Sequence, residues 1–183
     1  MKRSSLLVFV FSILSISVFA QEPTDKKPVI DDQPTPEYKL HTGLPAFNIL
    51  LLDSTTMFNT YNIPKGKPVV IMNFMPDCDH CQKLAEKLLK GMDTLKNIRF
   101  YLVSPMELKD IRRFSEKFDL AKYPNVVIGK DKDYFGPGFY QIKFVPFLAL
   151  YDKNKQLIRS FEQTVEVREL EAASKLKAPV ILK

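Results

Sequence analysis

Short apolar runs alternate along the chain with longer stretches in which apolar positions recur at helical spacing. The run over residues 69–74 is rich in β-branched side chains and predicts a buried central strand. Residues 78–92 predict a helix, because Leu84, Leu88 and Leu89 recur at helical spacing while Lys and Glu fill the other face. A strand is therefore expected to lead directly into a helix at residues 74–78.

The same reading predicts a mixed set of elements on either side of that junction. Further strands are expected over 47–52, 98–103, 126–128, 147–151 and 156–161, and further helices over 106–118 and 165–176. The segment 135–138, Phe-Gly-Pro-Gly, predicts a loop flanked by a helical turn. This order favours an α/β fold with a mixed central β-sheet and helices on both faces.

The first 37 residues have a different composition from the rest. Lys2 and Arg3 precede an apolar run from Leu6 to Phe19, and Ala20 offers a small residue for cleavage, which is typical of a signal peptide over residues 1–20. An uncleaved membrane anchor is the alternative, although the run is shorter than the roughly 20 residues that span a bilayer. Residues 21–37 are rich in Pro and charge and predict a flexible linker. One domain is then expected over residues 38–183.

The cysteines restrict the range of possible functions more than any other feature of the sequence. The chain contains 2 cysteines, Cys78 and Cys81, and they are separated by two residues at the predicted strand-to-helix junction. A disulfide that closes so short a loop stabilises a fold little, so a redox role is favoured. Free backbone N–H groups and the macrodipole at a helix start favour a thiolate at the first cysteine, and the second lies one turn further in, close enough to attack it. Cys78 would then attack a substrate disulfide, and Cys81 would resolve the mixed disulfide.

Two other uses of this pair are open, and its neighbours could tune it. Half of a zinc site and a purely structural disulfide are both compatible with the spacing, although only His41 and His80 could complete a ligand set. His80 would stabilise a thiolate and favour the reduced form, whereas Asp79 would act in the opposite direction. The sign of the reduction potential therefore stays open.

A second feature is Val145-Pro146, directly before the strand predicted at 147–151. Proline cannot donate a hydrogen bond within a sheet, so it is expected at the first residue of a strand or in a special turn. The X–Pro bond is also the one peptide bond for which the cis isomer costs little.

Together, the strand, the Cys78-to-Cys81 motif at a helix start and the Val145-Pro146 strand entry resemble the thioredoxin-like superfamily. The exported thiol–disulfide oxidoreductases of the TlpA/ResA type are the most similar branch. The resemblance implies a thioredoxin-like three-layer sandwich. It also implies that Cys78 is the nucleophile, that Cys81 resolves, and that Pro146 is a cis-proline facing the pair, with Val145 offering backbone groups to a bound peptide.

The sequence departs from that branch around the cysteines. The aromatic residue expected before the first cysteine is Asp77, the buried acid expected six residues before it is Met72, and the glutamate expected three residues after the second is Leu84. The proton acceptor usually assigned to the second cysteine is therefore missing at both habitual places. A peroxiredoxin-like protein and a thioredoxin-fold binding module with an incidental disulfide remain as alternatives.

The sequence also predicts the binding partners and the cellular location of the protein. Loss of residues 1–20 would remove Lys2 and Arg3 and no acid, lowering the formal net charge from +6 to +4, which indicates a solvated basic surface and no nucleic-acid partner. We expect protein thiols or disulfides as substrates and a membrane thiol carrier as electron donor. We expect a periplasmic, exported protein without a stable membrane span after signal removal, with the alternative of membrane association. Neither a cofactor nor a metal ion is expected.

Overall fold

A single seven-stranded sheet organises the part of the chain that the structure describes. The computed structural model describes residues 36–179, so the expected signal peptide and all but the last two residues of the expected linker lie outside it. The strands are β1 (Asn48–Leu51), β2 (Met57–Asn59), β3 (Val69–Asn73), β4 (Arg99–Ser104), β5 (Val126–Lys130), β6 (Phe147–Tyr151) and β7 (Leu157–Glu162). Their order in the sheet is β2-β1-β5-β4-β3-β6-β7.

The sheet is mixed, as the sequence predicts. The strands β3, β4 and β5 run parallel, whereas β1, β2, β6 and β7 join by antiparallel pairing. All five residues of β3 are buried, since this strand lies between two neighbours and under helices on both faces. The connections between parallel strands pass through helices, which is the usual way to join strands that point in one direction.

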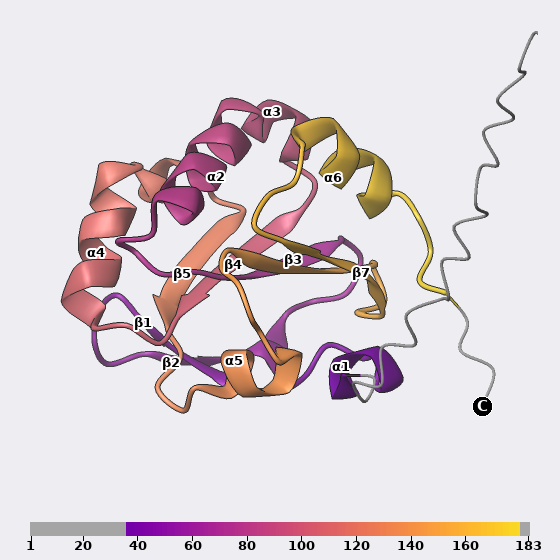
Figure 1. Ribbon diagram of the computed structural model, residues 1–183, viewed down its shortest axis with the longest axis horizontal. Helices are drawn as coiled ribbons and strands as arrows, with labels where there is room; N and C mark the ends of the chain where they lie inside the picture. The colour runs from indigo at the N-terminus through magenta and orange to yellow at the C-terminus, as the bar shows by residue number, and fades with distance from the viewer. Residues whose placement is uncertain (1–35, 180–183) are drawn as a thin grey trace, which may run out of the picture. The chain divides into compact units, whose positions relative to one another are not determined.

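Helices cover both faces of the sheet (Figure 1). They are α1 (Glu37–Leu40), α2 (Asp79–Lys90), α3 (Met92–Leu95), α4 (Leu108–Lys117), α5 (Phe135–Tyr140) and α6 (Val167–Ser174), with single 3₁₀ turns at Thr60–Asn62 and Leu120–Lys122. The first core cluster joins one sheet face to α2, α3, α4 and α6. The second joins the opposite face to α1 and α5. Among the described residues, no helix is long and apolar enough to span a membrane.

Strand alternation divides the side chains of β3 between the two cores. Val70 and Met72 lie in the cluster that includes α2, whereas Val69 and Ile71 lie in the cluster that includes α1 and α5. The carboxyl end of β3 leads through Phe74 into the start of α2. The strand-to-helix junction expected from the sequence is therefore held from both sides by buried apolar residues.

The helix α5 replaces the breaker-rich loop that the sequence predicts at 135–138. The Asp131 side chain accepts hydrogen bonds from the backbone N–H groups of Phe135 and Gly136, at 3.1 and 2.8 Å. Gly136 also lies so close to Asn73 that a Cβ there would clash with the Asn73 Oδ1 atom. Tertiary contacts thus hold a helix in a segment with weak intrinsic helix propensity.

Candidate functional site

Cys78 caps the amino end of α2. Its backbone is extended, with φ −78° and ψ 118°, and its sulfur accepts a hydrogen bond from the Cys81 N–H, with 3.4 Å between the nitrogen and Sγ. A turn precedes it, since the Cys78 N–H donates to the Met75 carbonyl at 3.2 Å. The sulfur therefore stands at the helix end where unpaired N–H groups and the macrodipole favour negative charge.

The two thiols differ sharply in their surroundings. Cys78 is partly exposed, whereas the side chain of Cys81 is 0% exposed and lies in the core cluster with Leu84 and Phe74. Burial raises the pKa of the Cys81 thiol to about 12, and the neighbouring Cys78 sulfur and Asp77 carboxylate act in the same direction. The structure thus presents one thiol to solvent and keeps the second protonated beneath it.

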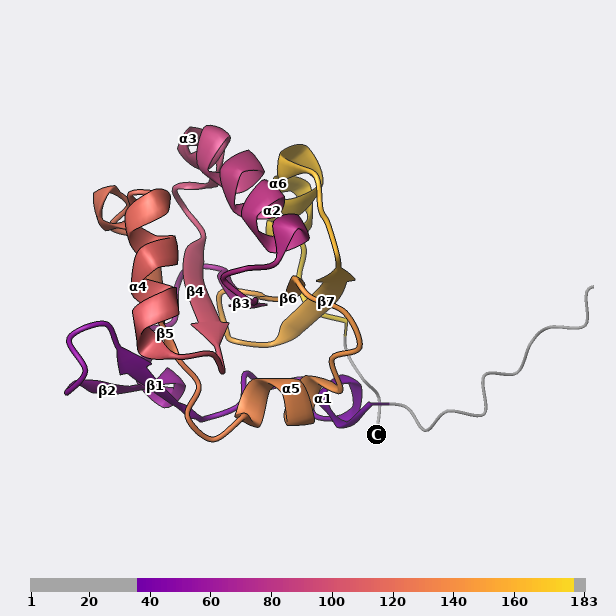
Figure 2. The same cartoon turned by 60° about the vertical axis from the view of Figure 1, so that its left-hand side comes forward.

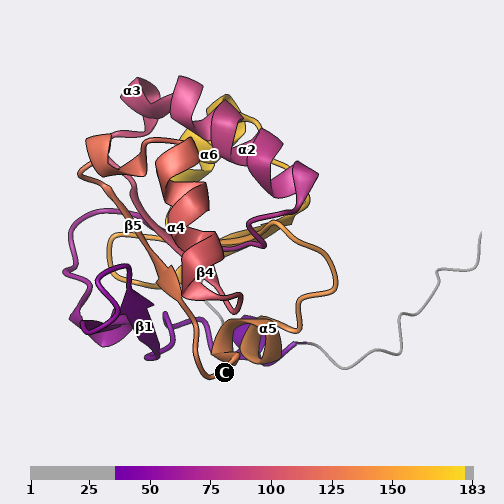
Figure 3. The same ribbon diagram turned by 90° about the vertical axis from the view of Figure 1, so that its left-hand side faces the viewer.

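The segment before β6 approaches this pair from far along the chain. Antiparallel pairing of β3 with β6 sets Asn73 opposite Phe147, which brings Pro146 to the carboxyl end of β3. The Val145–Pro146 peptide bond is cis, so that prediction is confirmed. The Val145 carbonyl oxygen lies 3.9 Å from the Cys78 sulfur, and the Pro146 carbonyl accepts from the Gln163 N–H at 2.8 Å. Figures 2 and 3 show this connection between α5 and β6 rising toward the start of α2.

The two residues between the cysteines are open to solvent. Asp79 and His80 are both exposed in the first turn of α2, and Asp77 before them is exposed too. These positions let their charges act on a partner that approaches Cys78. Their tuning role stays a prediction.

A side-chain tether near the cysteines was not apparent from the sequence. Gln82 Nε2 donates to the Pro76 carbonyl at 2.8 Å, and Gln82 Oε1 accepts from Lys117 Nζ at 2.6 Å. The tether links the turn before Cys78 to α4 and lies along a groove of about 330 Å³ beside Asp77. Only the packing of α2 against α4 brings these residues together, so sequence spacing carried no signal for them.

The buried surroundings of Cys81 contain few polar groups. Met72 and Leu84 are both buried, and the nearby carboxylate of Glu86 is exposed and pairs with Lys90 at 2.8 Å. On the opposite face of the sheet, against Gly136 of α5, Asn73 is 2% exposed, and both polar atoms of its side chain lack a hydrogen-bond partner among the described residues. No carboxylate therefore occupies either of the places where the resemblance would put a proton acceptor.

Within residues 36–179, no three His, Cys, Asp or Glu side chains are grouped closely enough to hold a metal ion.

Solved structures with similar architecture identify the fold. A secreted disulfide oxidoreductase of Mycobacterium tuberculosis, homologous to E. coli DsbE, superposes with a TM-score of 0.58 and 18% identity, covering 70% of this chain and 93% of its own. The chain has a thioredoxin-like fold. The thioredoxin domain of a thiol-disulfide oxidoreductase from Bacteroides vulgatus gives a TM-score of 0.57 at 22% identity, over 71% of this chain and 91% of that one.

The thioredoxin-like fold is also shared with a peroxiredoxin-like protein from Aquifex aeolicus. Its TM-score is 0.56 at 17% identity, over 72% of this chain and 85% of that chain. No protein-family model matches the sequence. No curated protein matches it either. The predicted three-layer α/β sandwich is confirmed.

Proposed function

We propose that this protein is an exported thiol–disulfide oxidoreductase that exchanges disulfides with protein substrates through Cys78 and Cys81. The observation that carries the proposal is the pairing of a partly exposed cysteine at a helix start with a buried thiol one turn behind it. A purely structural disulfide would not need this difference in exposure. A solvent-facing nucleophile with a protected second thiol is what disulfide exchange requires.

The reaction begins with Cys78 as the attacking group. Its thiolate attacks one sulfur of a substrate disulfide, the substrate S–S bond breaks, and the other substrate sulfur leaves as a thiolate. The Val145 carbonyl beside the Cys78 sulfur belongs to a partly exposed residue at the strand entry, whose backbone we expect to pair with an extended substrate chain. The product of this step is a mixed disulfide between Cys78 and the substrate.

Cys81 completes the exchange. It loses its proton and attacks the Cys78 sulfur, so the mixed disulfide breaks and the second substrate sulfur leaves and takes up a proton. Two electrons and two protons have then passed to the substrate, and the protein holds a Cys78–Cys81 disulfide. Since Met72 and Leu84 cannot accept the Cys81 proton, we propose that water accepts it.

We propose that the protein works as a reductant. The resemblance to TlpA/ResA-type proteins supports this direction, and the signal-like residues 1–20 support export to a periplasm-like compartment. Such a compartment is kept oxidising, so each turnover needs an electron supply. A membrane thiol carrier fits that need, because it would return two electrons to the Cys78–Cys81 disulfide by the same exchange chemistry.

Trapping of mixed disulfides tests the assigned roles. Changing Cys81→Ser removes the resolving attack, so disulfide-linked complexes with exported proteins should accumulate through Cys78. The matched variant Cys78→Ser keeps an oxygen cap on α2 and should trap nothing. Complexes that form only with Cys78→Ser would reverse the roles, and complexes with neither variant would favour a binding module with an incidental disulfide.

A further inference from the structure

A second surface lies at the opposite end of the sheet from Cys78. A cavity of about 1000 Å³ opens between the segment after α1, the turn joining β6 to β7, and the segment after α6. Pro68, in its lining, directly precedes β3, and β3 runs from there toward Cys78. A five-residue strand alone extends about 17 Å. The cavity is therefore remote from the redox site.

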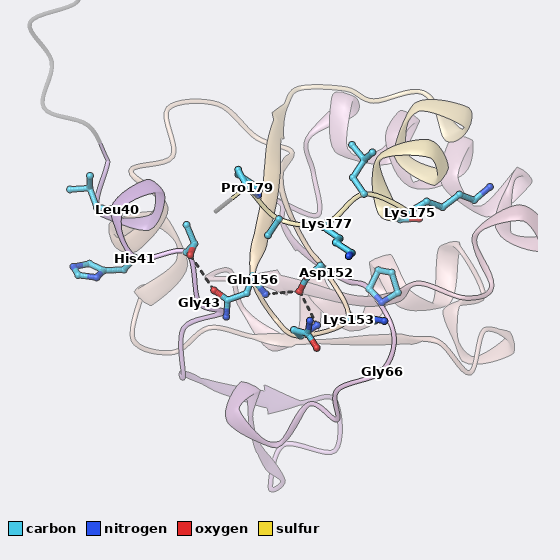
Figure 4. A pocket seen from close by; sticks show the side chains of 16 residues that line it. Leu40, His41, Gly43, Gly66, Asp152, Lys153, Gln156, Lys175, Lys177 and Pro179 are labelled. Atoms are coloured by element: carbon cyan, nitrogen blue, oxygen red, sulfur yellow. Dashed lines mark hydrogen bonds between the residues drawn. The ribbon is translucent and has the colours of Figure 1, made fainter. Parts of the chain in front are cut away.

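The cavity has an excess of positive charge. Lys153 and Lys177 are exposed in its lining, and neither has a carboxylate partner among the described residues, whereas Lys175 pairs with Glu171 at 2.6 Å. Asp152 is the one acidic residue of the lining, and it is 7% exposed, with Oδ1 accepting from the Asn154 and Gln156 N–H groups. Figure 4 shows Lys153 and Lys177 beside this hydrogen-bonded turn.

Two large apolar side chains also line this cavity. Leu40 is 60% exposed and Leu176 is 57% exposed, and both line the cavity. A small anion or an acidic protein segment would satisfy the lysines but leave both leucines in water. A phospholipid surface covers both kinds of side chain at once, since phosphates lie at the level of the lysines and acyl chains begin just below.

We propose that this end of the domain docks on an anionic phospholipid surface. Lys153 and Lys177 contact the headgroup phosphates, and Leu40 and Leu176 enter the boundary between headgroups and acyl chains. The docked domain keeps Cys78 on the side facing away from the lipid. The inference is independent of the proposed redox chemistry, because none of its residues contacts the cysteines.

A lysine footprint on the full chain tests the contact surface. The protein is mixed with vesicles of phosphatidylcholine alone or of phosphatidylcholine and phosphatidylglycerol at 3:1, acylated briefly, and mapped by mass spectrometry. Lys153 and Lys177 should be protected at least threefold on the anionic vesicles only. Lys109 and Lys132 are exposed near the other end of the sheet and should react equally with both. Because the readout is local, an apolar segment that anchors the chain elsewhere does not affect it.

Paired variants measure the charge contribution. Each lysine near an anionic surface strengthens binding about fivefold, so Lys153→Glu/Lys177→Glu should lower the ratio of anionic to neutral vesicle binding on the order of 30-fold or more. Lys109→Glu/Lys132→Glu makes the same change in net charge and should lower it less than about threefold, since charges beyond a Debye length are screened. Equal losses in the two double variants would overturn the proposal.

Two further experiments distinguish binding to a lipid surface from binding to soluble anions. Leu40→Ser/Leu176→Ser should also weaken binding to the anionic vesicles, and a circular dichroism melt should show each variant folded. Full binding by the serine variant would overturn the proposal. So would protection of Lys153 and Lys177 by inorganic phosphate alone or by soluble polyglutamate to the extent seen with vesicles, since either would indicate a site for a free anion or an acidic polypeptide.

Discussion

The buried thiol of Cys81 should react far more slowly than an ordinary cysteine. The cleanest test is alkylation by iodoacetamide of the Cys78→Ser variant, in which Cys81 is the one remaining thiol. In the native chain, burial raises the pKa from 9.0 to about 12, with a smaller contribution from the Cys78 sulfur that the variant lacks. A rise of that full size lowers the thiolate fraction at pH 7 about 1000-fold, which sets the upper limit for the variant. The higher basicity of that thiolate makes it intrinsically about 20-fold more nucleophilic. The net effect is a rate up to about 50-fold below that of the unfolded chain, before steric protection is added.

The pH dependence of the alkylation rate distinguishes a rate lowered by protonation of the thiol from a rate lowered by steric protection. Since the protonated form is favoured by burial, the folded protein's rate should keep rising about tenfold per pH unit from pH 7 to beyond pH 9. The same variant unfolded in urea should level off near pH 9, the ordinary value. A mass-spectrometric time course of carbamidomethylation gives both curves. A folded-state rate within threefold of the unfolded rate, or a plateau near pH 9, would refute the argument that burial holds Cys81 protonated.

Two further predictions concern the contacts between α5 and the sheet. Gly136→Ala should lower the free energy of unfolding in urea by about 1–3 kcal/mol, because the added Cβ would meet Asn73 Oδ1. The control Gly138→Ala, where a Cβ would meet nothing within 4 Å, should be neutral or stabilising. Equal effects of the two changes would contradict this prediction. The Tyr140 and Tyr151 hydroxyls share a buried 2.7 Å hydrogen bond, so either single change to Phe should cost about 1–3 kcal/mol while the double change costs less than their sum. Additive losses would show that the bond does not couple them.

The central part of the fold could be predicted because its local and tertiary signals agree. The apolar run that forms β3 needs burial on both sides, and the Leu84–Leu88 stripe of α2 supplies one of those sides. The β6–β7 hairpin was predictable for a similar reason, since two apolar runs flank a polar four-residue turn. In each case the residues that form the element also form its principal contacts.

The elements that could not be predicted from the sequence depend on contacts with residues far away along the chain. The strand β2 has three residues, exposes Met57, and pairs only with β1, so it carries almost no periodic signal. The helix α5 contains two glycines and a proline, and is held by Asp131 and by packing of Tyr140 against Tyr38 and Phe147. Neither contact can be inferred from residue spacing.

The candidate site shows the same division. The cysteine motif is local, so it could be predicted from the sequence alone. The family resemblance predicted that Val145–Pro146 lies near the cysteines, and the pairing of β3 with β6 brings it there. The tether from Gln82 to Lys117 joins two helices that are 35 residues apart at these positions. The lining of the lysine-rich cavity comes from four segments that are separate in the sequence. Such features appear only once the chain is folded.

Catalysed reduction of a protein disulfide tests the central claim most directly. The full chain is supplied with dithiothreitol and a disulfide-bonded polypeptide such as insulin, and the initial rate is compared with dithiothreitol alone and with Cys78→Ser. We predict a rate at least tenfold above the uncatalysed reaction, and a return to the uncatalysed rate when Cys78 is replaced. A wild-type rate equal to that of dithiothreitol alone, or a rate that survives the loss of Cys78, would contradict the assignment of this protein as a thiol–disulfide oxidoreductase.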